Sequence, residues 1–104
     1  MTVETTTVVT LKPGRFEDYI QKMARPSKAI VEKYGGRNVR LLAGLVGGEA
    51  TGTLVISTEA DDFAAAGAVM DKNLSDPDTQ KRMALGEDSP IASYQVSQWI
   101  EIPL

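Results

Sequence analysis

The 104-residue sequence predicts a single α+β domain, residues 1–104, whose elements follow the order strand, helix, strand, strand, helix, strand. Two kinds of periodicity carry this prediction. β-branched and apolar residues alternate with period two near both ends of the chain and in its middle, as in half-buried strands. Between these stretches, apolar residues recur at spacings of three and four, as in amphipathic helices. Hydrophobic residues make up 42% of the chain and charged residues 24%, which is the composition of an ordinary folded domain.

The first strand is expected over residues 2–12, where threonine and valine dominate, and Pro13 and Gly14 end it. The apolar stripe that begins at Phe16 predicts a long helix that ends at a glycine cap formed by Gly35 and Gly36. The stripe keeps its phase past Pro26, although proline lacks the N–H that an interior helical position needs. We therefore expect this helix to be kinked or briefly broken near Pro26.

Two further strands are expected over residues 38–46 and 51–57. Residues 47–50 lie between them and include two glycines, which permit the positive φ angles of a hairpin turn. These two strands should therefore pair in the antiparallel direction.

Thr58 followed by Asp61 resembles a capping box and predicts the start of the second helix. Gly67 on the buried face of this helix is expected to let it approach the sheet closely. Asp76 and the proline after it predict a fresh start for a short helix to about residue 85. Alternation resumes after Pro90 and predicts the last strand over residues 93–102.

Right-handed crossovers fold this order into a ferredoxin-like β-α-β-β-α-β unit, a four-stranded antiparallel sheet with both helices on one face. The other face of the sheet carries few charges and would be costly to leave in water. A second copy of the chain could cover it. By register, this uncovered face should bear Thr6, Val8, Thr10, Leu42, Val55 and Trp99 or their neighbours.

The element order, the long helix after a strand-Pro-Gly turn, and the segment LSDPDTQKRMA at residues 74–84 together resemble the dimeric α/β-barrel superfamily. This superfamily includes antibiotic-biosynthesis monooxygenases and stress-responsive cyclase-like proteins, and the resemblance covers the whole chain. It implies that two ferredoxin-like protomers pack sheet to sheet as a homodimer. The segment at residues 74–84 is similar to the stretch that forms a substrate lid in that group.

The chain contains no histidine and no cysteine, which removes most of the usual catalytic side chains. Thiolate nucleophiles, serine-histidine pairs, zinc fingers and histidine-ligated haem all need one or the other. The histidine-dependent cyclase-like and haem-degrading activities of the superfamily are therefore not expected, whereas its cofactor-independent oxygenases fit better. We expect neither a cofactor nor a metal site, because helix capping accounts for the clustered aspartates.

The net charge of −3, with lysine and arginine interleaved among acids, argues against a nucleic-acid partner. No apolar run approaches the roughly 20 residues that cross a bilayer, so no membrane partner and a cytoplasmic location are expected.

The sequence predicts a mainly apolar cavity between the sheet and the helices that binds a small organic molecule. Trp99 breaks the apolar phase of its strand, so an interface anchor is favoured over a pocket wall. Asn73 is a further polar residue that is expected to orient a ligand in the cavity. The candidate ligand-binding residues are Phe16, Tyr19, Met23, Asn38, Arg40, Phe63, Met70 and Tyr94, and the candidate interface residues are Trp99, Val8 and Thr10.

The sequence is compatible with two functions. The first is a cofactor-independent monooxygenase or isomerase that acts on a small, aromatic substrate and uses tyrosine or carboxylate for proton transfer. The second is a non-catalytic binding or assembly module. A space between sheet and helices that is fully filled by Phe16, Met23, Phe63 and Met70 would favour the second.

Overall fold

The computed structural model describes residues 1–44 and 53–104, and its elements follow the predicted order. The predicted hairpin turn at residues 47–50 lies outside the described residues. The elements are β1 (Val3–Leu11), α1 (Phe16–Tyr19), the π-helical turn η1 (Ile20–Ala24), α2 (Arg25–Lys33), β2 (Arg37–Ala43), β3 (Thr53–Ala60), α3 (Phe63–Ser75), α4 (Pro77–Met83), the 3-10 turn η3 (Gly86–Asp88) and β4 (Ile91–Ile100).

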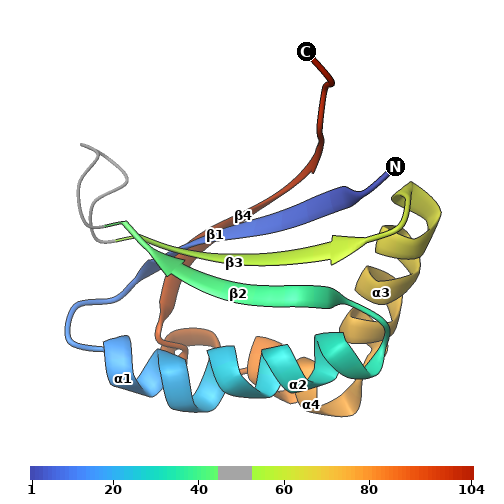
Figure 1. Cartoon of the computed structure of the whole chain (residues 1–104). Coiled ribbons are helices and arrows are strands. Elements are labelled where there is room, and N and C mark those ends of the chain that lie inside the picture. Colours follow the sequence, from blue (N-terminus) through green and yellow to red (C-terminus); the bar gives the residue numbers. More distant parts are fainter. Residues whose placement is uncertain (45–52) are drawn as a thin grey trace.

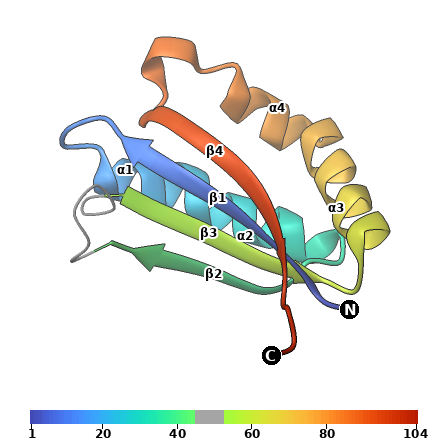
Figure 2. The same cartoon turned by 90° about the horizontal axis from the view of Figure 1, so that it is seen from above.

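The four strands form one antiparallel sheet in the order β2-β3-β1-β4, with the helices on one face (Figure 1). Viewed from above, α1 to α2 run under the middle of the sheet, and α3 and α4 lie toward its β4 edge (Figure 2). The predicted ferredoxin-like α+β fold is confirmed. The two middle strands are β1 and β3, which do not follow one another in the chain, so both crossovers pass through the helical layer.

The alternation of β1 divides its side chains between the two faces of the sheet. Val3 and Val9 face the helices, are almost completely buried, and pair with Ala60 and Leu54 of β3. Val9, Leu54, Tyr19 and Met23 form one core cluster, while Val3 and Ala60 form another with Ala66 of α3. Thr5 and Thr7 share this face, whereas Glu4, Thr6 and Val8 face away from the helices, as the period of two requires.

The first helical run changes its hydrogen-bonding pattern and does not break. Ile20 and Arg25, at the two ends of the π-helical turn, both keep right-handed helical dihedral angles. Pro26 then lies in the first turn of α2, where a missing N–H costs least. The interruption expected at Pro26 thus takes the form of a π-helical turn directly before it. Such turns often accompany functional sites.

The predicted start of the second helix is wrong. Thr58 lies within β3, and the N-cap is Asp62, whose Oδ1 accepts a hydrogen bond of 2.7 Å from the backbone N–H of Ala65. β3 runs on to Ala60 because that residue pairs with Val3 at the start of β1. The predicted cap at Asp76 is correct, since its side chain accepts from the N–H of Asp78 at 2.9 Å.

The close approach expected at Gly67 is absent, and the chain instead makes one at Gly36. A Cβ atom at Gly67 would meet no atom within 4 Å among the described residues. At Gly36, a Cβ atom would collide with the Val31 side chain and come within 2.8 Å of Thr58 Oγ1. Gly36 therefore lets the end of α2 turn tightly into β2 against β3.

We expect Gly36→Ala to lower the free energy of unfolding by about 1–3 kcal/mol, because its methyl group overpacks the site. The matched change Gly67→Ala should instead raise it by about 0.5–1 kcal/mol, since alanine restricts the unfolded chain and meets open space. Urea unfolding of both variants measures the difference. Equal stability of the two variants would contradict the close approach at Gly36.

Candidate functional site

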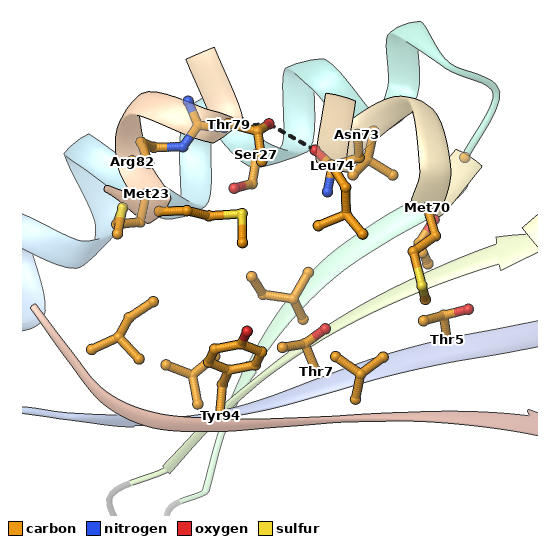
Figure 3. Close-up of a pocket in the computed structure, with 18 of the residues that line it drawn as sticks. Thr5, Thr7, Met23, Ser27, Met70, Asn73, Leu74, Thr79, Arg82 and Tyr94 are labelled. Carbon is orange, nitrogen blue, oxygen red and sulfur yellow. Dashed lines mark hydrogen bonds between the residues drawn. The ribbon is translucent and has the colours of Figure 1, made fainter. Parts of the chain in front are cut away.

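A cavity of about 760 Å³ lies between the sheet and the helices. Its sheet side is lined by β1, β3 and β4, and its helical side by η1, α2, α3 and α4 (Figure 3). Thr5 and Thr7 of β1 and Tyr94 of β4 stand on the sheet side, and the hydroxyl of Tyr94 points toward the helices. The run from α1 to α2 and the pair α3 and α4 are spread apart over the sheet, and the cavity lies between them (Figure 2).

Most of the cavity wall is apolar. Met23 and Met70 extend into it from opposite helical halves, and Ile56 and Val96 contribute from the sheet (Figure 3). Methionine is unbranched and polarizable, so it adapts its shape to irregular neighbours. An apolar wall of this size with a few convergent polar groups is the usual composition of a small-molecule site.

The polar groups on the helical side form a hydrogen-bonded chain. Thr79 Oγ1 donates to Asn73 Oδ1 at 2.9 Å, and Arg82 Nη2 donates to Thr79 Oγ1 at 3.2 Å. Thr79 and Arg82 are one turn apart on α4, and Asn73 belongs to the last turns of α3. This chain holds the Arg82 side chain against the wall of the cavity.

A second contact ties the start of α4 to the end of α2. Tyr34 Oη donates to Asp76 Oδ2 at 2.7 Å, and Asp76 caps α4 with its other oxygen. The hydrogen bond from Tyr34 is the main cause that lowers the pKa of Asp76, and the same bond raises the pKa of Tyr34. α4, the helix that carries Arg82, is therefore held at its N-cap, Asp76.

Tyr19 lies at the junction of α1 and η1 and is 1% exposed. Its ring lines the cavity, but within the described part of the chain its hydroxyl has no hydrogen-bond partner. Burial raises the pKa of Tyr19 to about 12. The hydroxyl therefore stays protonated near neutral pH, and the ring is the part of Tyr19 that contributes to the cavity wall.

The structure brings four of the predicted ligand-binding residues to the cavity, namely Tyr19, Met23, Met70 and Tyr94. Asn73, expected as polar guidance, also lines it. Phe16 and Phe63 lie elsewhere, with 50% and 48% of their surface exposed. Each is the first residue of its helix, beyond the part of the helix that packs on the sheet.

Asn38 and Arg40 also lie outside the cavity lining. Arg40 pairs in register with Ser57 of β3, on the sheet face away from the helices, and its Nη2 lies 3.5 Å from Glu4 Oε1. Asn38 has a φ of 49° and its amide donates to Glu59 at 3.3 Å. The register of β2 is irregular between Arg37 and Arg40, which places both side chains away from the cavity.

Arg82 and Thr79 were not predicted as site residues. Both belong to the segment at residues 74–84, whose resemblance to a lid stretch was the one available signal. The i, i+3 spacing of Thr79 and Arg82 puts them on the same side of a helix. Whether that side faces a cavity depends on how α4 packs, which the local sequence does not contain.

The outer sheet face bears the predicted interface residues. Val8, Thr10 and Trp99 all point away from the helices, and no helix or strand of the described residues covers this face (Figure 1). Trp99 is 57% exposed and its indole N–H donates to Thr6 Oγ1 at 2.8 Å. The hydrogen bond ties the indole to β1, and its exposed ring offers apolar surface to a partner.

An antiparallel four-stranded sheet in the order β2-β3-β1-β4 with helices on one face is a ferredoxin-like fold. The solved structures similar to this chain have that fold. An uncharacterized NIPSNAP-like domain protein from Burkholderia xenovorans is 15% identical with a TM-score of 0.77, and the match covers 97% of this chain and 85% of that one. A candidate antibiotic biosynthesis monooxygenase from Bordetella bronchiseptica is 18% identical with a TM-score of 0.69, and the match covers 98% of each chain.

A NIPSNAP family protein from Agrobacterium tumefaciens is 12% identical with a TM-score of 0.76, over 97% of this chain and 86% of that one. No protein-family model and no curated protein matches the sequence. The likeness to the solved structures confirms the resemblance seen in the sequence at the level of the fold. No helix among the described residues is long and apolar enough to cross a membrane.

Proposed function

We propose that this protein is a homodimer in which each protomer binds a small organic molecule in the cavity between its sheet and helices. The observation that carries the proposal is the cavity of about 760 Å³ with its mainly apolar wall. Ligand pockets in proteins measure roughly 300–1,000 Å³ and combine apolar walls with a few placed polar groups. An empty space of this size would be costly in a protein that used it only as core.

The placement of four large side chains supports this function over a purely structural module. Met23 and Met70 line the cavity without filling it, while Phe16 and Phe63 lie outside its lining. The space between sheet and helices therefore stays open.

A homodimer is supported by the outer face of the sheet. Val8, Leu42 and Trp99 are all exposed there, and such apolar patches on one face commonly mark an interface. Stacking two of these faces would remove apolar surface from water in both protomers, which stabilises a chain of this small size. The similar solved proteins share the protomer fold on which such stacking rests.

Catalysis is a second candidate function at the same cavity, as a cofactor-independent monooxygenase or isomerase. It is supported by two tyrosines in the cavity wall, of which Tyr94 points its hydroxyl into the space (Figure 3). The Tyr19 hydroxyl is completely buried, so Tyr94 is the tyrosine that would move a proton in such a reaction. The name of the Bordetella protein suggests the oxygenase reaction. Oxygen uptake on addition of an aromatic phenol separates an oxygenase from a protein that binds without reaction.

Binding in the cavity is tested with N-phenyl-1-naphthylamine, a neutral probe whose fluorescence rises in apolar surroundings. Thr7→Trp places an indole on the floor of the cavity, and strands accept aromatic residues well. We expect this change to weaken probe binding at least about tenfold, which corresponds to about 1.4 kcal/mol.

The matched control is Thr7→Val, which keeps the size of the side chain and should change the dissociation constant by less than about twofold. Thermal unfolding of both variants verifies that the fold is intact. Probe binding that is equally strong in Thr7→Trp would place the probe outside the cavity, and no binding to the wild type would contradict the proposed function.

A further inference from the structure

We infer that the ligand of this cavity is an organic monoanion, a carboxylate on an apolar body, and that Arg82 binds its carboxylate group. This inference rests on the proposed function and specifies its ligand class. Among the residues that the structure describes, two charged ones line the cavity, Arg82 and Glu59. Their side chains differ in what they face.

Glu59 does not neutralise Arg82. Alternation along β3 sends Thr58 and Ala60 toward the helices and Glu59 toward the opposite face. Its carboxylate accepts a hydrogen bond from Asn38 there. Within residues 1–44 and 53–104, no carboxylate lies within ion-pair distance of Arg82, although five other ion pairs are formed.

The guanidinium is positioned but not saturated. Its one hydrogen bond within the described residues runs from Nη2 to Thr79 Oγ1, which is itself held by Asn73. A guanidinium carries five N–H donors in a planar fork, so most of them remain for a ligand. Figure 3 shows Arg82, Thr79 and Asn73 together on the helical side, across the cavity from Tyr94.

The charge favours a carboxylate over a phosphate. A carboxylate carries one negative charge, which one arginine balances, and its two oxygens match the guanidinium fork. A phosphate ester carries about −1.5 to −2 charges at neutral pH and would leave excess charge against an apolar wall. The amide of Asp78 at the start of α4 is already bound by the side chain of Asp76, so it does not add a donor for phosphate.

The apolar body follows from the rest of the wall. Met23, Met70, Ile56 and Val96 line other parts of the cavity and carry no charge. Burying an aromatic or alkyl group against them is favourable in proportion to the area removed from water. The ligand should therefore have a carboxylate at one end and an apolar ring or chain at the other.

The test compares 2-naphthoate with 2-naphthamide, which have the same shape and differ in charge. Isothermal titration of the wild-type protein should show the carboxylate binding about ten times more tightly or better, since hydrogen bonds to charged groups are the stronger ones. Arg82→Gln should remove this preference by weakening 2-naphthoate about tenfold, while 2-naphthamide changes by less than about twofold.

Lys81→Gln is the matched control, because it removes the same charge from the neighbouring exposed position of α4 and does not touch the cavity. It should leave both affinities unchanged. Equal affinity of the wild type for the two compounds would overturn the inference, and so would an equal loss of both in Arg82→Gln, which would make Arg82 a structural residue. Binding of neither compound would also count against it.

The neutral probe separates the two proposals. If N-phenyl-1-naphthylamine binds and responds to Thr7→Trp while the anion preference is absent, the cavity function stands and the carboxylate assignment fails. If the neutral probe does not bind, the proposed function itself fails.

Discussion

Tyr19→Ala is expected to lower the free energy of unfolding by about 3–5 kcal/mol, the cost of removing a large aromatic side chain from a core. Tyr19 packs with Val9, Met23 and Leu54 and joins the first helical run to the centre of the sheet. In a domain of this size, that loss lowers Tm by on the order of 15 °C. Calorimetry of the variant measures it, and a Tm within a few degrees of wild type would contradict the placement of Tyr19.

Tyr19→Phe separates the ring from its hydroxyl. The hydroxyl is buried without a partner in the described structure, so its removal should raise the free energy of unfolding by about 1 kcal/mol. The two proteins should also differ in their response to alkaline pH. The folded-state pKa is about 12 and the ordinary value is 10.0, so the unfolded chain loses this proton first as pH rises.

An unfolded state that binds fewer protons becomes more favourable as pH increases. Between pH 10.0 and about 12, the wild type should therefore lose stability more steeply than Tyr19→Phe, while below pH 10 this hydroxyl adds no pH dependence. Urea unfolding of both proteins across this range isolates the one hydroxyl. Parallel curves would show that folding does not raise the pKa of the Tyr19 hydroxyl.

The local periodicity of the sequence was sufficient to predict the sheet and its two faces. Because side chains alternate strictly along a strand, the pattern in β1 and β4 placed Val8 and Trp99 on the outer face, where the structure has them. Local sequence does not predict secondary structure that depends on pairing with a distant strand. The sequence predicts a helix cap at Thr58, because the residues around it do not reveal that β3 continues to Ala60 and pairs there with Val3.

The candidate site could be predicted only in part, because periodicity shows which side of a helix faces inward but not which residues reach the cavity. Helical spacing placed Met23 and Met70 on inward faces, and both line the cavity. The same spacing included Phe16 and Phe63, but each is the first residue of its helix. Periodicity alone does not show that these first residues lie beyond the part of the helix that packs on the sheet. The local sequence predicts a surface arginine at position 82, and its place in the cavity wall depends on contacts between elements, from Tyr34 to Asp76 and from Thr79 to Asn73.

Val8→Arg is expected to convert a dimer into monomers. Val8 lies at the middle of β1, a central strand, between Val55 of β3 and Gln95 of β4 on the outer face. If two outer faces stack, an arginine here would be buried opposite its own copy without a partner, and breaking an interface in this way costs several kcal/mol. Sedimentation at about 10 µM, a concentration well above the dissociation constants of stable homodimers, should show a dimer for wild type and a monomer for the variant.

The fluorescence of Trp99 also measures dissociation of the dimer, because Trp99 is the one tryptophan in the chain and lies on the proposed interface. Its indole is 57% exposed in the single protomer and would be covered by a stacked partner. We therefore expect blue-shifted emission in the wild type and a red shift in Val8→Arg, with dilution of the wild type producing the same red shift. Ala29→Arg, on the exposed side of α2, is the control and should alter neither mass nor emission. A wild type that sediments as a monomer at this concentration, with emission already typical of hydrated indole, would leave the outer face free and refute the homodimer.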